Sequence, residues 1–458
     1  MLFHSTRGKD PNKDFASILM QGLADDGGLF MPDYWPQVDL DEIKSKTSFV
    51  DIAKCIVPLF TSSSFSYDET IAIVESTWHN FEHQDLIGIR DFNSFSILEL
   101  FHGPTAAFKD FGLQLAAAFF NKVLESENKT AIVLGATSGD TGSAAIDACK
   151  NYDRIKSFIM LPNGNMSEVQ RRQMSTIKAS NVFALRINGT FDDCQDLVKL
   201  AFKKRDFLNS NQYLLAVNSI NWTRIIGQIC YYFYAYNRLH EKCNLNFSIP
   251  TGNFGNVFAC YSAHKMGLPI NKISVAVNEN DILYRFFSNN NYSKQAVHET
   301  ISPSMDISVA SNFERLVYDL FLDRDSVKCF KMFDNFPANP IELDPITWQK
   351  KDHLFSSSKV NDLDTKKIIQ ETHRLFDYIL DPHTAVAAVE AFNKSDENNH
   401  YVVLSTAHPA KFPKVYEELD IEINSLPFAL RDLFKKEEHL HSFDADYNQI
   451  VNFINRNN

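Results

Sequence analysis

Lys109 occupies a position that suits covalent chemistry. It lies in the segment HGPTAAFKDFG, residues 102–112, in which a Gly-Pro turn precedes a helix predicted from about Phe111. An apolar neighbour such as Phe108 and the positive end of a helix both disfavour an ammonium group, so we expect a lowered pKa. A lysine of this kind can form an imine with a carbonyl group. The alternative is a surface lysine whose charged end extends into solvent.

A glycine-rich loop, GATSGDTG, occupies residues 135–142 between a predicted strand at 132–134 and a predicted helix. Glycines allow the backbone to approach a ligand, and free N–H groups at a helix start favour an anion. Thr137, Ser138 and Thr141 add hydroxyl groups. The loop matches neither the dinucleotide fingerprint nor the Walker sequence. We predict an anion site here, with a simple strand–helix turn as the alternative.

A second loop of this type, PTGNFGN, spans residues 250–256 between a predicted strand at 247–249 and a predicted helix at about 257–266. The same physical argument predicts a second small-anion site. Two such sites imply ligands with at least two anionic groups. A cofactor phosphate and a substrate carboxylate would be one such pair.

Two further polar segments accompany these loops. In LSTAHPAKF, residues 404–412, hydroxyls at a strand end could bond a ring nitrogen; His408 is interpreted as a structural histidine and Lys411 as a surface lysine. In NSINWTR, residues 218–224, a polar cluster precedes an apolar run and contains an arginine, which makes a good phosphate clamp. A helix cap with a solvated first turn would explain the second cluster equally well.

The elements that must position these residues alternate between short apolar runs and helical stretches from about Phe95 onward. This alternation predicts an α/β fold with parallel sheets covered on both faces, whose ligands lie at the carboxyl ends of the strands. The N-terminal part is helical near 50–60 and 68–82. Residues 285–370 suggest loops or an elaborated insertion, and the tail after Leu426 is predicted to be helical and peripheral. Strands are predicted at 132–134, 158–161, 182–187, 247–249, 273–277 and 401–404.

Composition narrows the functional class. The chain has 458 residues, 44% of them hydrophobic, and a formal net charge of −12, so we expect two or three domains and no nucleic-acid partner. The apolar run between Arg224 and Arg238 is shorter than the roughly 20 residues of a membrane span and predicts a buried helix. Seven scattered cysteines without a Cys-x-x-Cys pair, and the absence of a secretory signal, favour no metal site and a cytoplasmic location.

Together with STRG at residues 5–8 and GLADDGGLFMP at 22–32, these motifs resemble the threonine synthase family, whose enzymes use pyridoxal 5′-phosphate on the tryptophan-synthase-β-like fold, fold type II. The N-terminal signature and the motifs at 102–112, 135–142, 250–256 and 404–412 occur in family order, and the resemblance runs over nearly the whole chain. The resemblance implies a helical N-terminal domain over 1–82 and a smaller, mobile α/β lobe over 83–215 with the Schiff-base lysine. A larger α/β lobe over 216–458 would hold the cofactor phosphate, with the active site between the lobes.

The resemblance also assigns roles to residues. Lys109, beside Phe108, would carry the cofactor and move protons, Thr406 would bond the pyridine nitrogen, and Asp140 would lie near the 3′-oxygen, where many relatives of the wider fold have Asn. The implied ligands of the cofactor phosphate are Gly252, Asn253, Phe254, Gly255 and Asn256. The implied ligands of the substrate are Thr137, Ser138 and Thr141 for its carboxylate, and Asn218, Ser219 and Arg224 for its phosphate.

The implied reaction converts O-phosphohomoserine and water to threonine and phosphate. A related phospho-lyase, which would release an oxo acid and ammonia from O-phosphohomoserine or O-phosphothreonine, is an alternative that the motifs do not exclude. A non-catalytic relative would lack the lysine or a phosphate loop, and both are present. A dinucleotide-dependent oxidoreductase would need a fingerprint that is missing. The expected partner is a small-molecule substrate, without nucleic acid, membrane or metal, in a monomer or small homo-oligomer.

Overall fold

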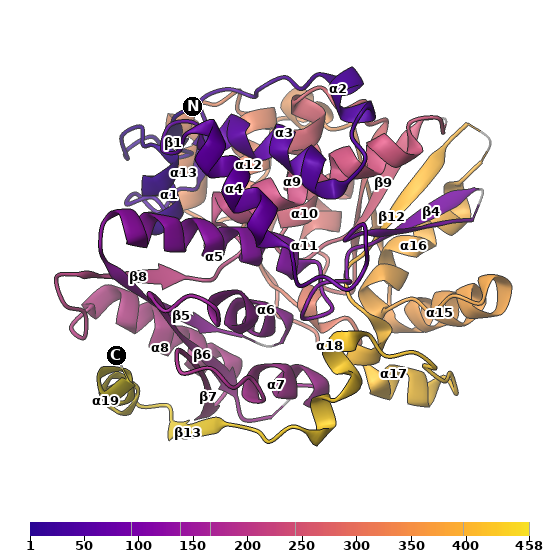
Figure 1. The fold of residues 1–458 in the computed structure, drawn as a ribbon. Helices are drawn as coiled ribbons and strands as arrows, with labels where there is room; N and C mark the ends of the chain where they lie inside the picture. Colours follow the sequence, from indigo (N-terminus) through magenta and orange to yellow (C-terminus); the bar gives the residue numbers. More distant parts are fainter. Residues whose placement is uncertain (93, 138, 165, 243, 397, 458) are drawn as a thin grey trace.

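The computed structural model describes residues 1–457 except 93, 138, 165, 243 and 397. Two separate parallel sheets with helices packed around them form the body of the molecule (Figure 1). The predicted α/β class is therefore confirmed, and so is the helical character of the N-terminal part. Among the described residues, none of the helices combines the length and apolarity that crossing a bilayer requires.

The first sheet has six strands in the order β11-β10-β9-β12-β4-β3, and only the β3–β4 pair is antiparallel. Its central strands β9 and β12 are buried along their whole length, as expected for parallel strands covered on both faces. The strands are β3 Gly88–Asp91, β4 Phe95–Glu99, β9 Leu245–Pro250, β10 Lys272–Val277, β11 Phe355–Lys359 and β12 His400–Ser405.

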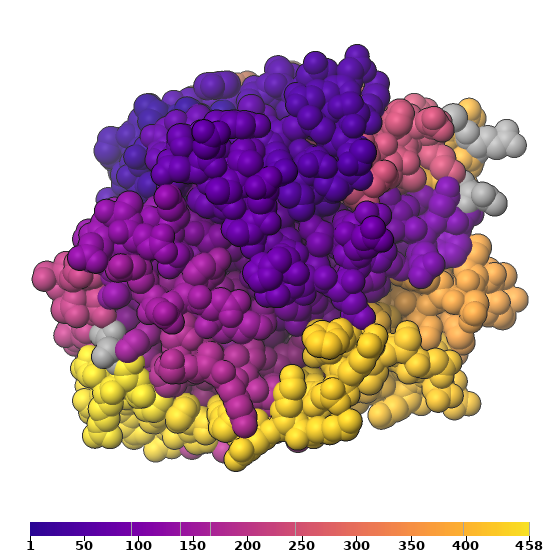
Figure 2. All heavy atoms as spheres, in the orientation of Figure 1, coloured from indigo at the N-terminus to yellow at the C-terminus, as the bar shows by residue number. Residues whose placement is uncertain are grey.

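The second sheet has five parallel strands in the order β13-β7-β6-β5-β8. Its edge strand β13 comes from the C-terminal tail, which follows the lower edge of the molecule in Figure 2 (yellow). The prediction of a helical, peripheral tail was thus wrong for this strand, because its pairing is set by β7, far away in the sequence. The strands are β5 Thr130–Ala136, β6 Ile155–Pro162, β7 Val182–Asn188, β8 Gln212–Ala216 and β13 Leu440–Asp444.

Strand pairing crosses the lobe limits expected from the sequence. Strands β3 and β4, within 83–215, belong to the six-stranded sheet, whereas β13, within 216–458, belongs to the five-stranded sheet. The region 285–370 also contributes more than loops, because β11 forms the edge of the six-stranded sheet beside β10.

The N-terminal helices α1, α2 and α3 pack on the long helix α9 (Trp222–Leu239), and the antiparallel pair of β1 with β2 lies beside them (Figure 1). A buried bond from Thr6 Oγ1 to Glu314 Oε1 (2.6 Å), with an ion pair from Arg7 Nη2 to Glu314 Oε2 (2.9 Å), fastens the N-terminus to α12. The elements of this part are β1 Phe3–Ser5, α1 Phe15–Gln21, β2 Phe30–Pro32, α2 Leu40–Lys44, α3 Phe49–Thr61 and α4 Tyr67–Thr77.

The remaining helices surround the two sheets. Around the five-stranded sheet and between the sheets lie α5 Lys109–Ser126, α6 Asp140–Cys149, α7 Glu168–Ser175, α8 Phe191–Lys204, α9 Trp222–Leu239 and α19 Tyr447–Asn457. The others are α10 Gly255–Lys265, α11 Ile282–Asn289, α12 Phe313–Leu316, α13 Ser326–Asp334, α14 Pro345–Gln349, α15 Asp362–Phe376, α16 Pro382–Lys394, α17 Pro413–Glu418 and α18 Phe428–Arg431. Short turns are η1 Pro303–Met305, η2 Val317–Phe321, η3 Pro409–Lys411 and η4 Leu433–Lys435.

Helices α5 and α9 cross with their backbones almost in contact, and this crossing places their N-terminal ends side by side. A Cβ added at Gly227 would lie 3.0 Å from Phe111 O, and one added at Gly112 would lie 3.0 Å from Arg224 Cα. Only glycine fits at both positions without a shift of one helix. The apolar run predicted as a buried helix is α9, in which only Arg238 is exposed.

Gly227→Ala should lower the free energy of unfolding by about 1 kcal/mol, because overpacking costs about 1–3 kcal/mol and outweighs the gain in helix propensity. Urea denaturation followed by circular dichroism measures the change. Helix propensity alone would stabilise the variant by about 1 kcal/mol. A more stable variant would therefore show that the crossing has room for a methyl group.

Candidate active site

Lys109 is the first residue of α5, and its side chain is only 11% exposed. Its Nζ lies 4.9 Å from the centre of the Phe108 ring. Burial lowers the pKa of Lys109; the Asp140 carboxylate opposes this shift, while the charges of Lys411 and Arg224 reinforce it. The alternative of a solvent-extended lysine is therefore wrong, and the expected lowered pKa agrees with the structure.

Asp140, the first residue of α6, accepts hydrogen bonds on both carboxylate oxygens. Its Oδ2 lies 3.2 Å from Lys109 Nζ and 3.3 Å from Ser304 Oγ, and its Oδ1 lies 2.8 Å from Lys411 Nζ and 2.9 Å from Gln170 Nε2. Burial alone would raise the pKa of Asp140, but the charges of Lys411 and Lys109 hold it well below its usual value. Asp140 is therefore an ionised carboxylate that links four segments of the chain.

Lys411 is fully buried, so its interpretation as a surface lysine was wrong. It ends the short turn η3 after strand β12, and its Nζ also donates to Thr105 O at 2.8 Å. The bond from Phe108 N to Thr406 O (2.9 Å) joins this segment to the Lys109 motif. Two predicted motifs more than 290 positions apart thus meet at one carboxylate.

The loop at residues 250–256 connects β9 to α10 and forms a cradle of backbone. Phe254 has a φ of +63° directly before α10, and no side chain caps the start of this helix. A Cβ at Gly252 would lie 2.9 Å from Ser304 O, so glycine is required there. Asn256 Oδ1 is buried and has no partner among the described residues. The uncapped helix start leaves backbone N–H groups free to donate to a bound phosphate.

In the loop at residues 135–142, the hydroxyl of Thr137 is used within the loop itself. Thr137 Oγ1 accepts from Gly139 N (3.0 Å) and from Gly142 N (2.9 Å) and donates to Gly139 O. Thr141 is partly exposed at the start of α6, and Ser138 lies outside the described residues. Thr137 therefore shapes the loop, whereas Thr141 stays a candidate for substrate contact.

Arg224 lies in the first turn of α9 and is 4% exposed, yet its Nε and Nη1 atoms have no partner among the described residues. Burial lowers its pKa to about 10, so it remains charged at neutral pH. Gln228, one turn further along α9, also has a buried unpartnered atom, Oε1, which lies 3.6 Å from where a Cβ on Gly255 would be. Unsatisfied buried groups of this kind are expected where a ligand completes the site.

Asn218 and Ser219 contribute to the turn before α9 rather than to a visible anion site. Asn218 Oδ1 accepts from Ile220 N at 3.2 Å, and Ser219 O accepts from Asn312 Nδ2 at 3.2 Å. The sequence motif therefore combines a turn with one free guanidinium group. Gln228 was not predicted, although its spacing of four residues from Arg224 places both on one face of a helix.

Ser304 and His383 are further site residues that the sequence did not reveal. Ser304 N donates to His383 Nε2 at 3.1 Å, and His383 Nδ1 contacts Asp381 Oδ1 at 2.9 Å. Since Nε2 accepts, Nδ1 carries the proton that faces Asp381. These hydrogen bonds fix the position of η1, in which Ser304 contacts Asp140 and lies against Gly252.

His408 and His102, which lie in the predicted motifs, form contacts with other groups of the folded protein. His408 Nδ1 accepts from Ala410 N at 3.1 Å, and burial lowers the pKa of His408 to about 4, as suits the structural histidine predicted from the sequence. His102 Nε2 contacts Glu99 Oε2 at 2.9 Å. Within the described parts of the chain, no group of three His, Cys, Asp or Glu side chains is arranged to hold a metal ion.

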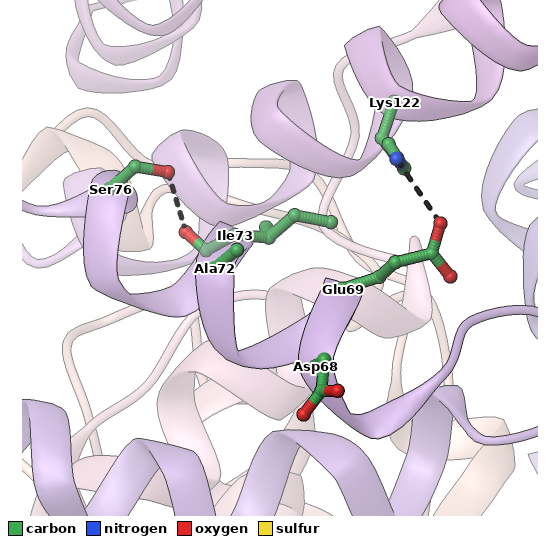
Figure 3. A pocket seen from close by; sticks show the side chains of 6 residues that line it. All are labelled: Asp68, Glu69, Ala72, Ile73, Ser76 and Lys122. Carbon is green, nitrogen blue, oxygen red and sulfur yellow. Dashed lines mark hydrogen bonds and ion pairs between the residues drawn. The ribbon is translucent and has the colours of Figure 1, made fainter.

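A hollow on the outer surface lies between α4 and α5, where Lys122 pairs with Glu69 at 3.2 Å (Figure 3). Lys122 lies about 20 Å along α5 from Lys109 at the helical rise of 1.5 Å per residue. This hollow is therefore separate from the buried site.

The residues present fit pyridoxal 5′-phosphate. Lys109 provides a largely buried amine, the loop at 250–256 provides a cradle of backbone before an uncapped helix start, and Thr406 lies at a strand end next to the Lys109 motif. Fold and site together define an enzyme of the parallel-sheet class that depends on this cofactor. The family model described as pyridoxal-phosphate dependent enzyme matches residues 93–330.

More specific comparisons agree with this class. Models of the threonine synthase N terminus and C-terminal part match residues 2–78 and 384–454. Threonine synthase of Pseudomonas aeruginosa is 42% identical, over 100% of this chain and 98% of that protein, and the Saccharomyces cerevisiae enzyme is 37% identical over 99% and 97%. The crystal structure of PLP-bound threonine synthase from Brucella melitensis superposes with a TM-score of 0.95 at 37% identity, covering 100% and 99% of the two chains. The chain therefore belongs to the threonine synthase family, and its cofactor is pyridoxal 5′-phosphate.

Proposed function

We propose that the chain converts O-phosphohomoserine and water to threonine and phosphate. The observation that carries this proposal is the unpartnered, buried guanidinium of Arg224 beside the buried amine of Lys109. Arg224 would bind the phosphate of the substrate, and Lys109 would move protons on the carbon chain of the substrate. The family membership supports the same reaction.

The cofactor, when bound, supplies a ring that withdraws electrons from the carbon bearing the substrate's amino group. Lys109 Nζ would take the proton from this carbon and exchange protons at the next one. Asp140 would hold Nζ through Oδ2, and Thr406 would bond the pyridine nitrogen. Backbone N–H groups of residues 252–256 would hold the cofactor phosphate.

The substrate would be fixed at its two ends. Thr141 and backbone N–H groups at the start of α6, with Thr137 shaping the loop, would bind its carboxylate. Arg224, assisted by the amide NH2 group of Gln228, would bind its phosphate. We propose that the released phosphate stays beside Arg224 and helps to activate the water that adds to the carbon chain. Arg224 is 4% exposed and the Lys109 side chain 11% exposed, which would limit the access of bulk water to the site.

The phospho-lyase reaction is separated from this proposal by its products. With O-phosphohomoserine the purified enzyme should release threonine and phosphate in equal amounts, measured by amino-acid chromatography and a phosphate assay. With O-phosphothreonine it should release little phosphate. Oxo acid and ammonia as the main products from either substrate would contradict the proposal.

We further propose a cytoplasmic enzyme with an N-terminal domain over 1–82 and lobes over 83–215 and 216–458, each of which contributes strands to the sheet of the other. The six cysteines in the described residues are free thiols, which suits a reducing compartment. A monomer or small homo-oligomer is proposed, and light scattering of the purified protein tests it.

A further inference from the structure

The proposed reaction assigns no role to Lys411, although burial of its ammonium group is unfavourable in free energy. A fully buried ammonium is stable only when paired and hydrogen-bonded. Lys411 meets both conditions, with Asp140 Oδ1 at 2.8 Å and Thr105 O at 2.8 Å. The same carboxylate also faces Lys109, at 3.2 Å. Two buried lysines therefore share one negative charge.

We propose that Lys411 is a positioning residue that shares Asp140 with Lys109 and thereby keeps the Lys109 amino group unprotonated and ready to react. This inference rests on the proposed function, because it concerns the lysine that captures the cofactor. It adds a role for a residue that the motifs and the reaction scheme leave unassigned.

The charged groups around Lys109 come from several elements and determine how well a proton on its amino group is compensated. Asp140 faces it from α6, Lys411 from η3 and Arg224 from α9, while His383 on α16 adds to the field at Asp140. Asp110, the neighbour of Lys109 on α5, is bonded to Thr105, and burial raises its pKa to about 7. With Lys411 charged, one carboxylate serves two amines, and a proton on Lys109 is poorly compensated. Without that charge, Asp140 would stabilise an ammonium on Lys109 alone.

The two carboxylate oxygens of Asp140 have different partners. Lys411 and Gln170 hold Oδ1, so Oδ2 is the oxygen directed at Lys109. Gln170 packs closely against Gly139, because a Cβ added at Gly139 would lie 2.5 Å from Gln170 Nε2. Asp140 is thus fixed in one orientation, and Lys411 provides the only charged contact to Oδ1 among the described residues.

The test is the pH dependence of cofactor capture by the full-length enzyme after removal of its cofactor. In this step the neutral amine of Lys109 attacks the aldehyde carbon, a C=N bond forms, and the aldehyde oxygen leaves as water with the two amine hydrogens. Stopped-flow absorbance gives the second-order rate constant with pyridoxal 5′-phosphate between pH 6 and pH 10. Lys411→Met should move the midpoint of this profile upward by at least about one pH unit, which makes capture about tenfold slower below both midpoints.

Matched variants separate this role from a structural one. Lys411→Arg keeps the charge and should keep the midpoint, as should Lys414→Met, a change at an exposed lysine three positions further. The double variant Asp140→Asn/Lys411→Met should return the midpoint toward that of the parent. Should Lys411→Met not fold, Lys411→Gln takes its place with the same expectation.

A Lys411→Met profile that is slower by the same factor at every pH, with an unmoved midpoint, would overturn the inference and leave Lys411 a structural residue. The proposed function would survive that result. A parent enzyme that forms no C=N bond with pyridoxal 5′-phosphate would instead overturn the proposed function.

Discussion

Lys109→Ala should lower kcat by about 10³-fold or more, because it removes the group that moves protons on the substrate. The same change should abolish covalent attachment of the cofactor, since the other buried amine at the site, Lys411 Nζ, is held between Asp140 Oδ1 and Thr105 O. Steady-state phosphate release and the visible absorption spectrum measure the two effects. The fold should remain intact, because Lys109 makes one ion pair and no core contact that the helix needs.

Lys122→Ala is the control for this prediction. Lys122 lies on the same helix and pairs with a partly exposed Glu69, so its loss should leave kcat within twofold of the parent. Retention of more than a tenth of the activity by Lys109→Ala would show that another group moves the proton.

Arg224→Met should raise the apparent KM for the phosphorylated substrate by about 10²-fold, because each hydrogen bond to a charged group contributes about 1.5–3 kcal/mol. It should also stabilise the substrate-free protein by about 1–3 kcal/mol, since a buried charge without partners opposes folding. Absorbance of the bound cofactor should stay normal. Steady-state kinetics and urea denaturation of the same preparation therefore test two opposite effects of this change, weaker substrate binding and a more stable substrate-free protein.

Arg238→Met is the matched control, at the exposed end of the same helix α9. Its Nη2 donates to Thr47 O at 2.7 Å, and its guanidinium lies over the Tyr234 ring. We expect little change in KM. If Arg224→Met left KM unchanged, the phosphate of the substrate would have to bind elsewhere. If it destabilised the protein, the guanidinium would have partners in the folded chain.

The parts of the site that are continuous in sequence could be predicted. Lys109, the loop at 135–142 and the loop at 250–256 each follow an apolar strand or turn and precede a helix, so local physics determines these elements and the anion-binding character expected of the two loops. The buried helix α9 followed from an apolar run of suitable length. The α/β class followed from the alternation of such segments.

The parts that depend on distant segments could not be predicted. Lys411 was interpreted as a surface lysine because nothing near it in sequence shows that Asp140 lies 2.8 Å from its Nζ. Ser304 lies in a region whose loops have no clear periodicity, and its contacts with Asp140 and His383 join segments that are far apart in the sequence. Strand β13 contains a short, mostly polar segment, and it forms because β7 offers it an edge.

The central claim is that Lys109 holds the cofactor covalently. It is tested most directly by reducing the yellow enzyme with borohydride, digesting it and mapping the modified peptide by mass spectrometry. The account predicts one modified residue, Lys109, carrying a reduced pyridoxyl phosphate group, with loss of the visible band. Modification of Lys411 or another lysine instead, or no modification at all, would contradict it.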